Sequence, residues 1–176
     1  WTRNGASMGD IEIRYSTDGG TTYPGVVVAN VASAALSHNW LIPDAIDNEV
    51  RVKITLLSDS TTTSASTANF SIKARFNVTS PNGNETWFVN EARDITWTTG
   101  GTVATVNLHY STDGGTNYSN LISGAEANDG TFSWTVPDAI SNQVRVRVQS
   151  VADTTVVDGS NANFTVKGTV AVTSPN

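Results

Sequence analysis

Two aspartates, Asp18 and Asp113, stand in nearly the same nine-residue sequence. Segment 15–23 reads Tyr-Ser-Thr-Asp-Gly-Gly-Thr-Thr-Tyr, and segment 110–118 repeats it with Asn117 in the place of Thr22. Carboxylates near glycines can bind calcium, but the alternating acidic spacing of a calcium loop is absent. Asp-Gly-Gly instead supplies the positive φ angles of a tight turn, and an aspartate can bond to the backbone of its own turn. We therefore predict structural turns, and no metal or cofactor, at two sets of residues: Asp18, Gly19 and Gly20, and Asp113, Gly114 and Gly115.

The side chains that could catalyse a reaction do not form a shared pattern. His38 and His109 are the only histidines, and neither stands beside a serine or a carboxylate in a sequence common to both halves of the chain. Two pairs of carboxylates have the residue types of a glycosidase, although an acidic chain with net charge -6 offers such pairs by chance: Glu85 with Glu91, and Asp129 with Asp138. The chain contains no cysteine, which excludes disulfides, thiolate zinc sites and cysteine nucleophiles. We expect that the protein is not an enzyme.

Basic side chains alternate with valines and isoleucine on two predicted strands, one in each half of the chain. Such outward-facing charges most often keep a surface soluble. Their spacing would also suit an acidic polysaccharide, with Trp87 or Tyr118 as aromatic stacking partners. The residues of this possible binding surface are Arg51, Lys53, Trp87, Arg145 and Arg147. Lys and Arg, 10 in all, are too few and too dispersed for a nucleic-acid partner.

Five asparagines begin an Asn-x-Ser/Thr sequence, the acceptor pattern for N-linked glycans in exported proteins. A chain rich in threonine and serine produces some of these by chance. The candidate attachment sites are Asn69, Asn77, Asn84, Asn117 and Asn163.

The two turns belong to a longer repeat, with a shift of 94 residues from Trp40 to Trp134. Segments 50–54, 70–73 and 78–82 return at 144–148, 164–167 and 172–176 with the same shift. Each unit contains about seven short segments of alternating apolar and polar residues, with turn signals about every 8–12 residues. This pattern predicts an all-β fold of tandem antiparallel β-sandwich domains, immunoglobulin-like or fibronectin-like. No apolar run reaches the roughly 18 residues of a membrane-spanning helix.

The second unit is the more complete one, and its apolar positions define the predicted core. We expect one helical turn at 138–140, after Pro137, and a long strand at 142–150. The predicted core comprises Ile95, Trp97, Val106, Leu108, Tyr110, Trp134, Val136, Ile140, Val144, Val146, Val148, Phe164 and Val166.

Three domains or parts of domains follow from this register. Residues 1–73 form a repeat that lacks its first strands, because Trp1 aligns with Trp97. Residues 74–167 form a complete repeat, and residues 168–176 match the opening strand of a third. We expect a window cut from a longer array. In the alternative, residues 168–176 of one molecule complete the open sandwich of the next.

Three segments in order carry a resemblance to a known family: Ser-Pro-Asn-Gly-Asn-Glu-Thr-Trp at 80–87, Ile-Thr-Trp at 95–97, and Tyr-Ser-Thr-Asp-Gly-Gly at 110–115. They resemble the tandem immunoglobulin-like repeats of large secreted and cell-surface proteins of bacteria and archaea. The resemblance implies an extracellular or cell-surface stalk, spacer, filament subunit or adhesin without catalytic residues. The expected partners are other copies or neighbouring repeats, and in the alternative a polysaccharide.

Segment 16–23 also resembles the Asp-box hairpin of sialidases and other propellers. The motif is structural, since its carboxylate accepts backbone amides across a tight turn. A propeller blade recurs about every 40–50 residues, which is half of the period found in this chain. Sialidase activity is therefore not expected.

Overall fold

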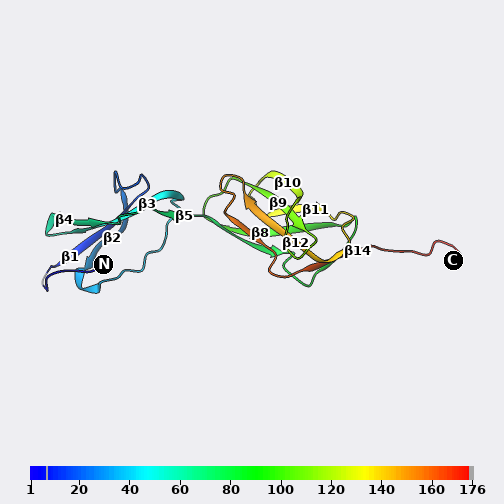
Figure 1. Ribbon diagram of the computed structural model, residues 1–176, viewed down its shortest axis with the longest axis horizontal. Helices are drawn as coiled ribbons and strands as arrows, with labels where there is room; N and C mark the ends of the chain where they lie inside the picture. The colour runs from blue at the N-terminus through cyan, green and yellow to red at the C-terminus, as the bar shows by residue number, and fades with distance from the viewer. Residues whose placement is uncertain (7, 175–176) are drawn as a thin grey trace. The chain divides into compact units, whose positions relative to one another are not determined.

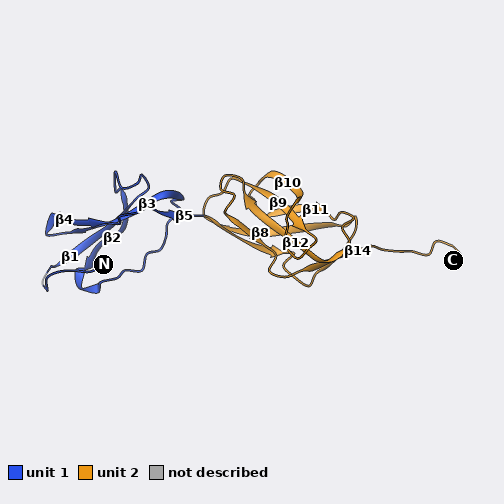
Figure 2. Cartoon of the chain, viewed as in Figure 1, with its two compact units in different colours: residues 1–73 blue, residues 74–176 orange. Residues whose placement is uncertain are grey.

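The structure is a computed structural model that describes residues 1–6 and 8–174 (Figure 1). The chain divides into two compact units, Trp1–Lys73 and Ala74–Asn176 (Figure 2). Strands make up the regular structure of both, apart from one short 3-10 helix, Ser33–Ala35, in unit 1. In the part of the chain that is described, no helix has the length and apolar character needed to cross a membrane.

Unit 2 is a β-sandwich of two sheets. The smaller sheet has the order β11-β8-β6, and the larger one has the order β10-β9-β12-β14-β7, with β13 also paired to β12. All pairs are antiparallel except β14 with β7. Two packed sheets of mainly antiparallel strands are the arrangement of immunoglobulin-like domains, so the predicted fold class is confirmed. The strands are β6 Arg75–Ser80, β7 Thr86–Phe88, β8 Ala92–Gly100, β9 Thr105–Ser111, β10 Asn120–Ala127, β11 Thr131–Thr135, β12 Ser141–Ser150, β13 Val157–Gly159 and β14 Phe164–Lys167.

The core of unit 2 lies between its two sheets. On β12 the side chains alternate, so that Val144, Val146 and Val148 are buried while Arg145 and Arg147 lie on the opposite face. Val, Ile and aromatic residues favour strands because their side chains pack well on a pleated surface. The buried core cluster is Ala74, Phe76, Val78, Trp87, Ile95, Trp97, Val106, Leu108, Trp134, Val136, Val144, Val146, Val148, Val156, Phe164 and Val166.

One predicted core residue and the predicted helical turn of unit 2 are wrong. Ile140 is 64% exposed, and residues 136–140 form neither helix nor strand. This segment connects β11 in the smaller sheet to β12 in the larger one. Because it connects the two sheets and belongs to neither, the alternation that buries Trp134 and Val136 does not extend to Ile140.

Unit 1 contains one sheet, which corresponds to the larger sheet of unit 2. Its order is β2-β1-β3-β4, and β5 also pairs with β3. Within residues 1–6 and 8–73 there is no second sheet, and segment 37–41, the counterpart of β11, forms no strand because no strand equivalent to β8 pairs with it. The strands are β1 Asp10–Ser16, β2 Gly25–Ala32, β3 Asp47–Leu56, β4 Asp59–Ala65 and β5 Phe70–Ile72.

The predicted opening strand of a third repeat, at 168–176, is not formed by residues 168–174. Its counterpart in unit 2, β6, is held by pairing with β8, whereas residues 168–174 pair with no strand among the described residues. Val170 and Val172 are therefore exposed, whereas Phe76 and Val78 at the matching positions of β6 are buried. Pro175 and Asn176 lie outside the described residues.

Candidate functional site

The turn around Asp18 is held by hydrogen bonds of two side chains. The Ser16 hydroxyl donates to the Asp18 carboxylate at 2.6 Å and accepts the backbone amides of Asp18 and Gly20 at 3.1 and 2.9 Å. The Asp18 carboxylate also accepts the amide of Thr22 at 3.0 Å and its hydroxyl at 2.5 Å. These side-chain partners all lie within four residues of Asp18, and the Gly19 amide also donates to the Glu49 carbonyl of β3 at 2.9 Å.

The turn around Asp113 in unit 2 has the same construction. The Ser111 hydroxyl donates to Asp113 at 2.5 Å and accepts the amide of Gly115 at 3.0 Å. Asn117 replaces Thr22, and its amide nitrogen Nδ2 donates to Asp113 at 2.7 Å. Within residues 1–6 and 8–174, no group of three or more His, Asp or Glu side chains is placed to hold a metal ion.

These hydrogen bonds stabilise the charged form of both carboxylates. The side-chain bond from Ser111, followed by the backbone and side-chain bonds from Asn117, lowers the pKa of Asp113 to about 2. The side-chain bond from Ser16, followed by the bonds from Thr22, lowers the pKa of Asp18 as well.

The lowered pKa predicts an acid-dependent contribution to stability. The native pKa of Asp113 lies below that of the unfolded chain, so its contribution is fully present above about pH 4 and is lost as the pH falls towards about 2. Asp113→Asn removes the titrating group. We expect the difference in unfolding free energy between wild type and Asp113→Asn to be constant above about pH 4 and to shrink below it, as measured by urea denaturation of unit 2. A difference that stays constant down to about pH 2 would contradict this role.

The tyrosine that ends each turn packs under the basic residues of the neighbouring strand. The Arg147 guanidinium carbon lies 4.5 Å from the centre of the Tyr118 ring, and the Lys53 nitrogen lies 4.6 Å from the centre of the Tyr23 ring. At these distances a cation is attracted to the face of the ring. Tyr118 is partly buried, and this burial raises its pKa. The predicted stacking partner for a sugar is thus already covered by a cation of its own unit.

The other two basic residues of the predicted binding surface bond to asparagines. Arg51 Nε donates to Asn69 Oδ1 at 2.6 Å, and Arg145 Nε donates to Asn163 Oδ1 at 2.6 Å. Arg145 also donates to the Ser160 carbonyl at 3.3 Å. The basic residues of β3 and β12 therefore help to hold β5 and the segment before β14 in place.

Trp87 does not belong to this surface. It is 5% exposed and packs against Phe164 and Trp134, with ring centres 5.0 and 6.1 Å apart. The prediction of an exposed Trp87 that stacks on sugar is wrong. Pairing of β7 with β14 turns this side chain inward between the two sheets.

The candidate glycan sites differ in what their side chains contact. Asn77 lies on β6 and Asn84 in the turn before β7, and both are exposed. Asn117 is exposed too, but its Nδ2, the atom to which a glycan is attached, donates to Asp113. The two remaining asparagines accept a bond from an arginine, as described above. Glycan attachment is thus sterically simplest at Asn77 and Asn84.

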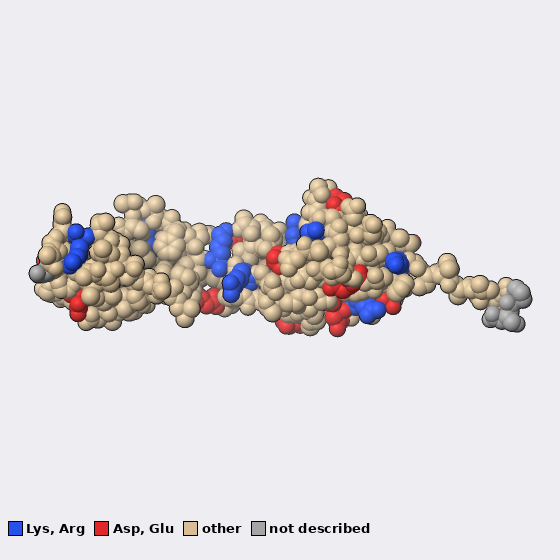
Figure 3. Space-filling model, turned by 90° about the horizontal axis from the view of Figure 1, so that it is seen from below, with Lys and Arg blue, Asp and Glu red and all other residues tan. Residues whose placement is uncertain are grey.

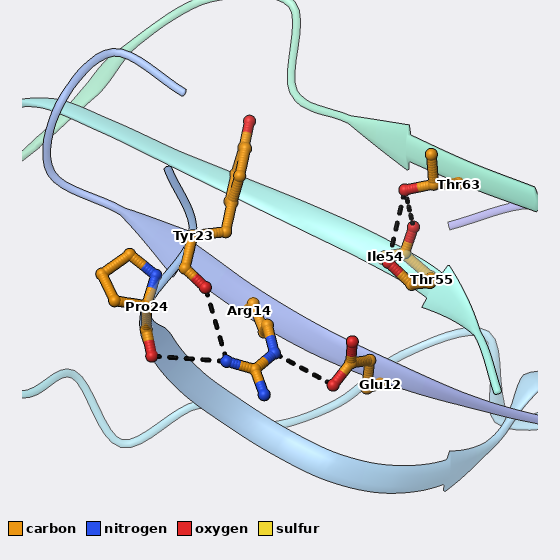
Figure 4. A network of polar contacts seen from close by, with 7 residues as sticks. All are labelled: Glu12, Arg14, Tyr23, Pro24, Ile54, Thr55 and Thr63. Carbon is orange, nitrogen blue, oxygen red and sulfur yellow. Dashed lines mark hydrogen bonds and ion pairs between the residues drawn. The ribbon is translucent and has the colours of Figure 1, made fainter. Parts of the chain in front are cut away.

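Charged side chains on the outer face of the unit 1 sheet tie its strands together (Figure 4). Arg14 forms an ion pair with Glu12 at 3.0 Å and donates to the carbonyls of the two residues before β2 at 3.5 and 3.4 Å. The hydroxyls of Thr55 and Thr63 lie 3.3 Å apart and link β3 to β4.

On the face of the molecule in Figure 3, Lys and Arg side chains stand among Asp and Glu and do not merge into one tract.

The inner face of the unit 1 sheet is partly open, since Ile11, Ile13 and Val50 are buried while Val52 and Ile54 are half-buried. Two hollows share Val52 and Ile54 in their walls, a pocket of about 450 Å³ that also contacts Ile11 and one of about 360 Å³ that also contacts Trp40. In unit 2 the residues in register with Val52 and Ile54 are fully buried beneath the smaller sheet. The sequence did not identify this face as a surface, although the alignment of Trp1 with Trp97 indicated that residues 1–73 contain no counterpart of β6 and β7.

No family model matches this chain, and no curated protein matches its sequence. A solved structure of the fibronectin(III)-like modules of Clostridium thermocellum CbhA aligns over 94% of this chain and 83% of its own, with 14% identity and a TM-score of 0.39. A chimeric titin Z1Z2-Z1Z2 tandem that carries an exogenous GRGDS peptide from fibronectin aligns over 93% of this chain and 87% of its own, with 13% identity and a TM-score of 0.33. At these identities and TM-scores, neither likeness assigns a ligand or an activity to this chain.

Proposed function

We propose that this chain is a non-enzymatic structural repeat of an extracellular or cell-surface protein, a building block of a stalk, filament or sheath. Its partners are other copies of itself or neighbouring repeats. Polar and charged side chains in both units form internal bonds, as the turns and the basic residues of β3 and β12 illustrate. Such side chains give a rigid module whose outer surface serves for spacing and packing.

The observation that carries this proposal is the open inner face of unit 1. A sandwich keeps the equivalent face dry, and an apolar surface that is only partly covered is typical of an interaction site. The face consists of apolar residues, and in unit 2 the equivalent residues are covered by the β-strands of the smaller sheet. We therefore propose that apolar strands of a neighbouring module complete unit 1 in the assembled material, an addition of strands to an incomplete sandwich.

Replacing Val52 by aspartate tests this proposal. The carboxylate would lie on the open face and oppose its burial against another module. Wild type is expected to associate more strongly as its concentration rises, and Val52→Asp is expected to remain monomeric, as measured by sedimentation velocity. Val26→Asp is the matched control, because Val26 is an exposed residue of β2 that lines neither hollow.

A wild type that stays monomeric at every concentration would contradict completion between copies. Equal association of Val52→Asp and Val26→Asp would show that the contact lies elsewhere. Val52→Thr, which keeps the volume and shape of valine, provides a second variant if the aspartate unfolds unit 1.

One observation favours the alternative, a carbohydrate-binding or adhesive module. Tyr15, Trp40 and Phe70 lie together in unit 1, with ring centres 5.2 and 6.4 Å apart, and Phe70 remains 37% exposed. Aromatic faces of this kind can stack on sugar rings. Titration with soluble oligosaccharides, followed through tryptophan fluorescence, separates the two functions, since strand completion predicts no response.

A further inference from the structure

Asn-Gly sequences are chemically reactive because glycine has no Cβ to shield its backbone nitrogen. In this reaction the glycine nitrogen loses its proton and attacks Cγ of the asparagine. The bond from Cγ to Nδ2 breaks, and Nδ2 takes up a proton and leaves as ammonia. Water then opens the resulting succinimide to aspartate or isoaspartate. The chain contains this dipeptide twice, at Asn4–Gly5 and at Asn82–Gly83.

In the second dipeptide, Asn82–Gly83, both reacting groups form hydrogen bonds with other residues. Glu85 accepts the amides of Asn82 and Gly83, one on each carboxylate oxygen, both at 2.7 Å. Asn82 Oδ1 accepts the amide of Asn161 at 2.7 Å, and the Asn82 carbonyl accepts the amide of Ala162 at 3.2 Å. The attacking nitrogen and the carbon under attack are therefore fixed by different partners.

Two physical effects follow from the position of Glu85. The nitrogen of Gly83 must lose its proton before it attacks, and a carboxylate that already accepts this proton in a charge-assisted bond opposes the formation of a second negative charge beside it. Rotation of the segment is also restricted, because Gly83 has a φ of 131° and packs so closely that an added Cβ would lie 2.6 Å from the Ala162 side chain.

We propose that Glu85 protects Asn82–Gly83 from succinimide formation, and that Asn4–Gly5 is the site where this chain deamidates first. Asn4 and Gly5 are both exposed. Three positions after Asn4 the sequence has a serine, whereas three positions after Asn82 it has Glu85. The protected segment joins β6 in the smaller sheet to β7 in the larger one. Isoaspartate would add a backbone atom at this connection and displace the bond from the Ser160 hydroxyl to the Pro81 carbonyl.

The two dipeptides allow an experiment with an internal reference. The folded chain is incubated at mildly alkaline pH, and tryptic peptides that contain Asn4 or Asn82 are followed by mass spectrometry for replacement of the amide by a carboxyl. In wild type, Asn82 is expected to convert at least about tenfold more slowly than Asn4. In Glu85→Ala, Asn82 is expected to convert about tenfold faster than in wild type, a factor that corresponds to loss of a charge-assisted hydrogen bond, while Asn4 is unchanged.

Glu91→Ala is the matched control. Glu91 also accepts a backbone amide, that of Phe88 at 3.0 Å, in the turn after β7, but it does not contact the Asn-Gly dipeptide. The proposal is overturned if Asn82 converts as fast as Asn4 in folded wild type, if Glu85→Ala leaves the rate at Asn82 unchanged, or if Glu91→Ala accelerates it equally. In denaturant the two asparagines are expected to convert at similar rates, which shows that the protection comes from the fold.

Discussion

Replacing Trp87 by alanine is expected to lower the unfolding free energy of unit 2 by about 3–5 kcal/mol. The indole is 5% exposed and contacts Trp134 and Phe164, so its removal leaves a cavity between the two sheets. Offset and tilted aromatic pairs also add about 0.5–1.5 kcal/mol beyond the area that they bury. A tryptophan that stacked on sugar at the surface would instead be replaced at little cost in stability.

Unfolding in guanidinium is measured through hydrogen exchange of the β12 amides. Because β12 belongs to unit 2, this measurement contains no contribution from unit 1. Ile140→Ala serves as the control, because Ile140 is 64% exposed and a surface change of this kind costs within about 0.5 kcal/mol. A cost below about 1 kcal/mol for Trp87→Ala would show that the core does not depend on this indole.

The sequence predicted the elements whose bonds are local and failed where burial depends on distant partners. All hydrogen bonds of the Ser111 hydroxyl and the Asp113 carboxylate reach residues within four positions, so the motif itself contains the side-chain bonds of the turn. The long strand β12 was equally readable, because a period of two over Val144, Val146 and Val148 has no competing interpretation.

Trp87 shows the opposite case. Its strand, Thr86–Phe88, has three residues, too few for a period, and the side chain is buried because β7 lies parallel to β14, about 80 positions further along the chain. The contact between Val78 and Asp158 could not be predicted for the same reason, since the Asp158 carboxylate accepts the Val78 amide at 2.7 Å across the two sheets.

The basic residues of β12 combine both situations. Alternation correctly places Arg145 and Arg147 on the face opposite the core valines. It cannot tell that Asn163 and Tyr118 lie against them, because these contacts follow from the pairing of β12 with β14 and β9. The alternating basic residues suit both ligand binding and internal packing. The positions of the neighbouring strands are needed to decide between the two roles.

Gly115→Ala is expected to destabilise unit 2 more than Gly114→Ala, although both glycines have left-handed backbone angles, with φ of 88° and 76°. The left-handed conformation costs an alanine about 1–2 kcal/mol at either position. At Gly114 an added Cβ has no neighbour closer than 3.6 Å, whereas at Gly115 it would lie 2.9 Å from the Tyr118 hydroxyl and 3.1 Å from Arg145 Cδ.

The difference between the two variants isolates the close approach of the turn to the tyrosine. The Tyr118 hydroxyl also lies near Gly159, where an added Cβ would be 3.0 Å from it. Overpacking of such a site costs about 1–3 kcal/mol, so we expect Gly115→Ala to exceed Gly114→Ala by about 1 kcal/mol or more in unfolding free energy, measured by guanidinium denaturation. Equal costs would mean that the Tyr118 side chain moves aside without a penalty when the Cβ is added.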